Sequence, residues 1–168
     1  MPHIRLQTII KAPVERVFDL SRSIDLHQIS TSNTDETAIS GVVSGLIDLN
    51  ETVTWKAKHF GIYQHLTSRI TELQFPHFFV DEMEKGIFKS LYHKHLFEDN
   101  NGSCVMTDYF DYQAPLGILG RLADILFLKK YLTKVLVERN AIIKKYAEGN
   151  DWHEIIQREK TIRMDPNT

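Results

Sequence analysis

The chain has a single cysteine, Cys104, among its 168 residues, so it cannot form an intramolecular disulfide bond. Its net charge of −2 at pH 7 gives no basic excess of the kind that nucleic-acid-binding domains carry. No apolar run approaches the roughly 18 residues of a membrane-spanning helix. Residues 1–5 lack the basic-then-apolar order of a signal peptide. We therefore expect a soluble, cytoplasmic protein that binds no nucleic acid and does not insert stably into a membrane.

Several short functional motifs are also absent from the sequence. It has no phosphate-binding glycine loop, nucleophile elbow, zinc motif or dinucleotide fingerprint, so we expect no cofactor. A chain of this length buries roughly 70% of the surface that its unfolded form exposes, so it needs neither a metal nor a disulfide to fold. We expect one domain over residues 1–149. Residues 150–168 then form a polar tail or a short docked helix.

Hydrophobic periodicity describes the first part of the chain. Alternating apolar residues predict a strand over Ile4–Ile10. Pro13 precedes an apolar pattern of helical spacing, which predicts a short amphipathic helix. Ser23 is a candidate N-cap for a second short helix that extends to Ile29. The polar residues 30–36 then predict a turn.

The middle of the chain alternates with the period of β-strands. Residues 37–48 hold a further candidate strand. Because the connections between the later strands are short, neighbouring strands must be antiparallel. The predicted strands are Leu49–His59, Ile62–Leu73, Phe78–Glu84, Lys89–Glu98 and Ser103–Tyr112.

A helical period returns after Pro115. It predicts one long helix from Leu116 to about Ala147, with Gly149 just past its end. The first half of this helix is too apolar for a surface helix, so it is read as core, as the roof of a pocket entrance, or as a membrane or partner contact. Gly117 and Gly120 weaken the first turns and suggest a gate there.

The order of these elements predicts an α+β fold. A curved antiparallel β-sheet wraps around one long C-terminal helix, with two short helices after the first strand. Only one long helix is available to cover the sheet, so the sheet must curl around it. This arrangement leaves a gap for a ligand wherever side chains do not fill the space between helix and sheet.

Several residue patterns point to a known family. They are Ala12-Pro13-x-x-x-Val17-Phe18, Trp55-x-Ala57-x-His59-Phe60-Gly61, Phe79-x-Asp81-Glu82-Met83-x-x-Gly86-x-Phe88, His93-x-His95-x-Phe97, Asp108, Tyr112 and Pro115-x-Gly117-x-x-Gly120. Over roughly residues 4–147 the chain resembles the START-like or SRPBCC superfamily, and within it the polyketide cyclase/dehydrase-like ligand-binding proteins of bacteria. The resemblance implies a helix-grip fold and no metal. It fixes no activity, because the superfamily includes lipid carriers, plant hormone receptors and aromatic cyclases.

The hairpin formed by Lys89–Glu98 and Ser103–Tyr112 gives the most specific site prediction. His93 and His95 share one strand face, while the opposite face carries the charged Lys94, so we expect both histidines to point inward. A turn centred between Asn100 and Asn101 would set His93 opposite Asp108, His95 opposite Met106, Phe97 opposite Cys104 and Leu91 opposite Phe110.

A buried imidazole–carboxylate pair has alternative roles. As catalytic residues, His93 and Asp108 would perform acid–base chemistry of a cyclase, dehydratase or hydrolase kind. As a structural pair, they would close the floor of the pocket or orient the polar end of a ligand. His93 and His95, with Asp108 and His59 nearby, also have metal-binding donor types, but no partner that would orient each ring is evident. We therefore expect no metal.

The sequence thus predicts an internal cavity with apolar walls and a polar His/Asp end. One residue of the pair Asp81-Glu82 should face it, because neighbours in a strand alternate sides. The expected ligand is small, largely apolar and lipid-, aromatic- or polyketide-like. An enzyme, an interaction module with a vestigial cavity, and oligomerisation remain open alternatives. The predicted ligand-binding residues are Trp55, Ala57, His59, Tyr63, Phe79, Met83, Leu91, His93, His95, Met106, Asp108, Phe110, Leu119 and Leu122.

Overall fold

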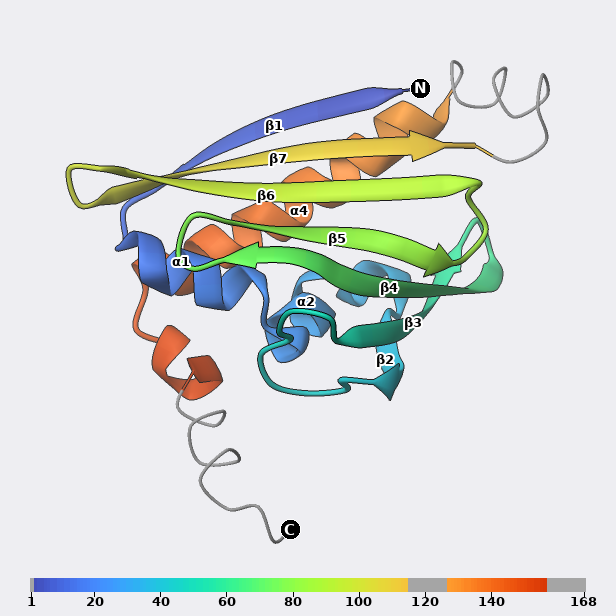
Figure 1. Cartoon of the computed structure of the whole chain (residues 1–168), viewed down its shortest axis with the longest axis horizontal. Coiled ribbons are helices and arrows are strands. Elements are labelled where there is room, and N and C mark those ends of the chain that lie inside the picture. The colour runs from blue at the N-terminus through green and yellow to red at the C-terminus, as the bar shows by residue number, and fades with distance from the viewer. Residues whose placement is uncertain (1, 115–126, 157–168) are drawn as a thin grey trace, which may run out of the picture.

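The computed structural model describes residues 2–114 and 127–156, and these form a curved β-sheet against a long helix (Figure 1). The elements are β1 (His3–Ile10), α1 (Val14–Ser21), α2 (Ile24–Ser30), the 3-10 helix η1 (Ser32–Thr34), β2 (Thr37–Gly41), β3 (Thr52–His59), β4 (Ile62–Gln74), β5 (Phe78–Lys85), β6 (Ser90–Asn100), β7 (Ser103–Gln113) and α4 (Lys129–Glu148).

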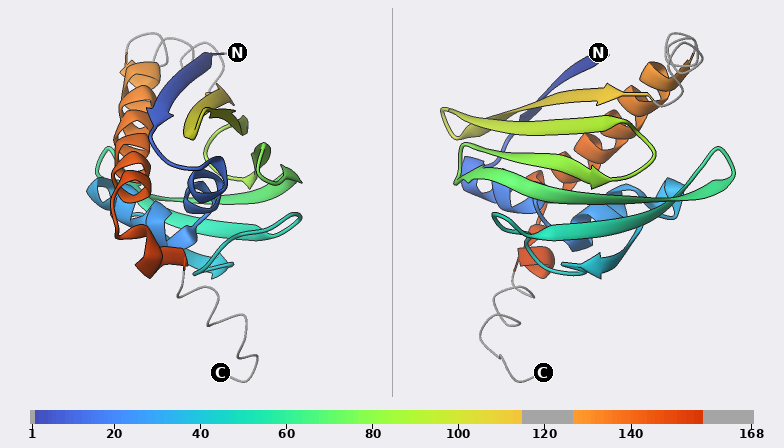
Figure 2. Two further views of the ribbon diagram at one scale, coloured as in Figure 1. Left: turned by 90° about the vertical axis from the view of Figure 1, so that its left-hand side faces the viewer. Right: turned by 45° about the vertical axis from the view of Figure 1, so that its right-hand side comes forward.

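Within these residues the sheet has seven strands in the order β1-β7-β6-β5-β4-β3-β2, and each neighbouring pair is antiparallel. Figure 2 shows the sheet curling so that its concave face turns toward α4. The helix packs against β1, α1 and α2. The predicted α+β helix-grip architecture is therefore confirmed.

Local sequence signals explain the short helices after β1. Pro13 immediately precedes α1, which buries Val17 and Phe18. The Ser23 side chain accepts a hydrogen bond from the Leu26 backbone N–H at 3.2 Å and so caps α2. Asp25 lies in the first turn of α2, where a negative charge is favourable. The predictions for both helices are confirmed.

Alternation along β6 positions the histidines. His93 and His95 are only 6% and 2% exposed, and they belong to the concave face of the sheet. Lys94 points the other way, with its Nζ 4.2 Å from the centre of the Phe78 ring. The predicted inward face of this strand is confirmed.

The predicted register of the β6–β7 hairpin is wrong by two residues. The turn is Asn101-Gly102, and both residues have positive φ angles, of 53° and 85°. Type I′ turns require such angles, and Asn-Gly is favoured in them. His95 is therefore opposite Asp108, and His93 is opposite Phe110. A shift of two residues preserves the faces, so each of these side chains still points inward.

Two apolar clusters fill much of the space enclosed by the sheet. In the larger one, Phe18 meets Phe79 and Phe97 edge-on, with ring centres 5.2–5.5 Å apart. The smaller cluster lies toward the other end of β6 and β7. It consists of Ile4, Leu91, Phe110, Tyr112 and Leu136.

The C-terminal part of the chain completes the fold. Helix α4 ends at Glu148, with Gly149 just past its end as predicted, and residues 152–156 are helical. Ile155 is buried in the larger cluster, and the Arg16 guanidinium lies 4.1 Å from the centre of the Trp152 ring. The division of the chain at residue 149 stays a prediction. No helix among the described residues is long and apolar enough to cross a membrane.

Some predictions concern residues that the structure does not describe. Residues 116–126 of the predicted long helix, the gate at Gly117 and Gly120, and the ligand-binding residues Leu119 and Leu122 lie outside the described residues.

Candidate functional site

A pocket of about 170 Å³ lies between the concave face of the sheet and α4. Its walls are mainly aromatic and aliphatic. The polar lining residues are Ser21, Arg22, Ser23, His27, Thr31, Glu36, His59, Asp81, His93, His95 and Arg139. We call the part of the pocket bordered by Asp81, His93, His95 and Arg139 its inner end. The apolar lining residues are Ile24, Ile47, Val53, Trp55, Leu66, Ile70, Phe79, Phe88, Leu91, Phe110, Leu132, Val135 and Leu136.

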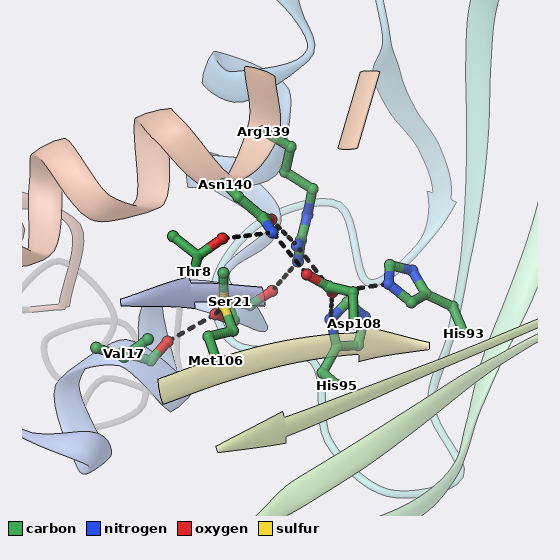
Figure 3. Close-up of polar contacts among 9 residues, drawn as sticks. All are labelled: Thr8, Val17, Ser21, His93, His95, Met106, Asp108, Arg139 and Asn140. Atoms are coloured by element: carbon green, nitrogen blue, oxygen red, sulfur yellow. Dashed lines mark hydrogen bonds and ion pairs between the residues drawn. The ribbon is translucent and has the colours of Figure 1, made fainter. Parts of the chain in front are cut away.

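Asp108 organises the polar inner end from behind the pocket wall (Figure 3). Its side chain is 0% exposed. His93 Nε2 lies 2.8 Å from Asp108 Oδ1 in a hydrogen bond. His95 Nδ1 lies 2.8 Å from the same oxygen, but its orientation does not satisfy hydrogen-bond geometry. The carboxylate therefore orients the His93 ring through a hydrogen bond and lies beside the His95 ring.

Helix α4 supplies the other partners of Asp108. Asn140 Nδ2 donates a hydrogen bond to Asp108 Oδ2 at 2.6 Å, and an Arg139 guanidinium nitrogen lies 3.8 Å from Oδ1. Arg139 also donates to the Asn140 side-chain oxygen at 3.1 Å and to the Ser21 carbonyl at 3.0 Å. A buried charge persists only when it is paired and hydrogen-bonded, and these contacts meet that condition for both Asp108 and Arg139.

Sequence reasoning missed Arg139 and Asn140, because charged and polar side chains of an amphipathic helix normally mark its solvent-facing side. Both residues are buried on one face of α4 together with Leu136, Ile143 and Ala147. These five positions repeat at intervals of three and four residues, which is the signature of a single helix face. That spacing is the signal that could have placed Arg139 and Asn140 inside.

The electrostatics of this end follow from burial and pairing. Burial opposes ionisation of Asp108, but the contacts to His93 and His95 outweigh it and hold the pKa of Asp108 well below its usual value. Burial also lowers the pKa of His95 far below that of a free imidazole. At neutral pH the site therefore contains an ionised Asp108, a neutral His95 and the Arg139 cation.

Asp81 is the member of the Asp81-Glu82 pair that lines the pocket. Its Oδ1 atom is buried and has no hydrogen-bond partner. Burial raises the pKa of Asp81, and this effect exceeds the opposing influence of His93 and Ser68. Glu82 lies on the other face, where it accepts a hydrogen bond from Thr71 Oγ1 at 2.9 Å.

A second polar group lies on the side of the pocket nearest α2. The His27 ring stacks on Trp55 with ring centres 4.2 Å apart, and His27 Nε2 is 3.3 Å from Glu36 Oε1. Burial works against the Glu36 charge, but His27 outweighs it and lowers the pKa of Glu36. His59 Nδ1 lies 2.8 Å from the Tyr131 hydroxyl, and burial lowers the pKa of His59.

The predicted ligand-binding residues do not all line the same pocket. Trp55, His59, Phe79, Leu91, His93, His95 and Phe110 line the main pocket. A smaller pocket of about 70 Å³ shares Trp55 and His59 with it and includes Ala57. Met83 packs against the smaller apolar cluster, and Met106 is buried in the larger one.

Tyr63 lies on the outer face of the sheet, contrary to its predicted place in the pocket. It is 54% exposed, and Lys56 Nζ lies 4.7 Å from its ring centre. The reason is the β3–β4 register, which pairs Tyr63 with Lys58. Residues directly opposite each other share a face, and Lys58 belongs to the outer one.

His93, His95 and Asp108 are the described residues with donor atoms close enough to hold a metal ion, all within 4.8 Å of one another. Two histidines and a carboxylate are a common donor set for divalent metals. Arg139 works against this role, because its guanidinium places a positive charge 3.8 Å from the shared carboxylate oxygen.

No family model and no curated protein sequence matches the chain. Solved structures do. One is ginseng major latex-like protein 151 from Panax ginseng, with a TM-score of 0.65 and 15% identity over 88% of this chain and 98% of that one. Another is a START superfamily protein from Mycobacterium smegmatis, with a TM-score of 0.66 and 9% identity over 87% and 97%. The KanY protein gives a TM-score of 0.69 and 13% identity over 89% and 100%. The chain therefore has the START-like, or SRPBCC, fold.

Proposed function

We propose that this START-like protein binds a small, largely apolar molecule in the pocket between the sheet and α4. The observation that carries the proposal is the composition of the pocket, which joins an aromatic and aliphatic wall to a buried polar end. Each 100 Å² of apolar ligand surface buried there contributes about 2.5 kcal/mol to binding.

The polar end favours one orientation of the ligand. Asp81, His93 and His95 border the inner end, whereas Phe79, Leu91 and Phe110 provide apolar contact beside them. A ligand with one polar group would place that group near Asp81 and His93 and its hydrocarbon body against the aromatic rings. Lipid-like, aromatic and polyketide-like molecules have this division, and a cytoplasmic location is part of the same proposal.

The test uses 2-acetylnaphthalene, an uncharged aromatic ketone, as the probe. Val135 lines the pocket from α4, while Val137 on the same helix is 46% exposed. We expect calorimetry to detect binding to the wild type. Val135→Trp should weaken it at least tenfold because the larger side chain fills the pocket, and Val137→Trp should leave it unchanged. Equal affinities for both variants, or no binding to the wild type, would refute the proposal.

A further inference from the structure

Asp81 and His93 form a second pairing at the inner end of the pocket, distinct from the contact between His93 and Asp108. The β5–β6 register sets Asp81 directly opposite His93, and both residues line the pocket. Directly opposite residues on one face have Cβ atoms about 4.5–5.5 Å apart. A carboxyl group and an imidazole therefore border the same small volume beside an apolar wall.

We propose that Asp81 and His93 act together as a general acid and a general base that catalyse enolisation of an apolar ketone held in the pocket. This activity rests on the proposed binding of an apolar ligand and adds a reaction to it. Asp108 touches no ligand in this scheme and is a positioning residue.

The contact with Asp108 identifies His93 as the base. A carboxylate oxygen only accepts hydrogen bonds, so His93 Nε2, 2.8 Å from Asp108 Oδ1, must carry the hydrogen. In the neutral ring the other nitrogen, Nδ1, then has a free lone pair. Figure 3 shows the His93 ring with one nitrogen toward Asp108 and the other turned away from it. Asp108 thus fixes the tautomer that a base at Nδ1 requires.

The surroundings of Asp81 suit an acid. Its Oδ1 atom is buried without a partner, which is costly for an ionised carboxylate and far less so for a neutral carboxyl group. Burial raises the pKa of Asp81, whereas the pKa of Asp108 is held low. Two carboxyl groups whose environments separate their pKa values are a recurrent feature of acid–base sites.

The proposed step is balanced and involves no oxidant or reductant. His93 Nδ1 removes a proton from the carbon next to the carbonyl, and the electrons of that C–H bond form the C=C bond of the enol. The electrons of the carbonyl π bond take the proton of Asp81 and form the enol O–H. The step leaves an imidazolium beside a carboxylate, an arrangement that attraction between opposite charges stabilises. The reverse step restores the ketone and both residues. In D₂O the imidazolium exchanges its N–H proton for deuterium with the solvent, so the reverse step places deuterium on the carbon.

The experiment follows exchange of the methyl hydrogens of 2-acetylnaphthalene for deuterium in D₂O by proton NMR. Wild-type protein should accelerate exchange above the buffer rate. Asp81→Asn and His93→Gln should each lower the protein-dependent rate by about 10² or more, the usual contribution of one general acid or base. The matched controls Glu82→Gln, on the outer face, and His77→Gln, at an exposed position, should stay within about twofold of the wild type.

Two further readouts separate the possible outcomes. Calorimetry with the same probe should give affinities for Asp81→Asn and His93→Gln within a few-fold of the wild-type value, which also verifies that the variants fold. In ¹⁵N NMR, Asp108→Asn should reduce the population of the Nε2–H tautomer of His93 together with the exchange rate.

A wild type that binds the probe without accelerating exchange overturns the enolisation proposal and leaves ligand binding intact. A wild type that does not bind the probe overturns both. Full exchange activity in Asp81→Asn overturns the assignment of the acid.

Discussion

Burial of His95 should make the stability of the protein depend on pH. The ring is 2% exposed and is stacked against Phe79, with ring centres 4.2 Å apart. Burial and the neighbouring His93 lower the pKa of His95, and these effects exceed the opposing influence of Asp108. The folded state therefore keeps His95 neutral at pH values where the unfolded chain would protonate it.

The sign and size of this pH dependence of stability follow from proton linkage. An unfolded histidine titrates near pH 6.5. Below this pH the unfolded state binds a proton that folded His95 does not, so the free energy of unfolding falls as the pH falls. The slope contributed by one such group approaches about 1.4 kcal/mol per pH unit, until the folded group also titrates. Stability from His95 is therefore complete above pH 6.5 and declines below it.

Urea unfolding between pH 7.5 and 5.5 measures this effect. His95→Gln removes the titrating group, so its free energy of unfolding should fall less steeply with pH than that of the wild type, by up to about 1.4 kcal/mol per unit. His77→Gln, at an exposed position, should keep the wild-type slope. Groups that do not contact His95, including His59 with its lowered pKa, titrate in all three proteins, so their contributions cancel in the difference between the curves. Parallel curves for wild type and His95→Gln would refute the reasoning.

Three further predictions concern single residues. Asp108→Asn should lower the free energy of unfolding by about 3–5 kcal/mol in urea titrations at pH 7, because Arg139 would remain buried without its carboxylate partner. A loss below about 1 kcal/mol would contradict this prediction. Gly102→Ala should lower the free energy of unfolding by about 1–2 kcal/mol in thermal unfolding, because Gly102 has a φ of 85° that disfavours a side chain. An added Cβ would meet no atom within 4 Å, so the measurement reports backbone strain alone. Unchanged stability would argue against the turn. Tyr63→Ala should leave calorimetric affinity for 2-acetylnaphthalene unchanged while Leu91→Ala weakens it, and the opposite ranking would place the ligand on the outer face.

The elements and their faces were predictable because local patterns determine them. Period-two alternation in β6 places His93 and His95 inside, and the position of Ser23 marks the start of α2. These signals depend on side-chain type and spacing within a short segment, so no knowledge of distant contacts is required.

Register and distant partners were harder to predict. Moving the β6–β7 turn to Asn101-Gly102 shifts the pairing by two residues, and alternation alone cannot detect such a shift because each side chain keeps its face. Arg139 was not predicted as a site residue because charge normally marks the solvent side of a helix, and only its contacts with Asp108 and Ser21 make its burial favourable. These partners are far away in the sequence, so no local pattern reveals the pairing.

The most direct test of ligand binding is a crystal structure of the protein with 2-acetylnaphthalene. The account predicts the naphthalene rings against Phe79, Leu91 and Phe110, with the carbonyl oxygen within hydrogen-bonding distance of the Asp81 carboxyl group. It would be contradicted by a probe bound only on the outer surface, for example at the exposed Phe60 and Ile62, with the interior pocket closed by its own side chains.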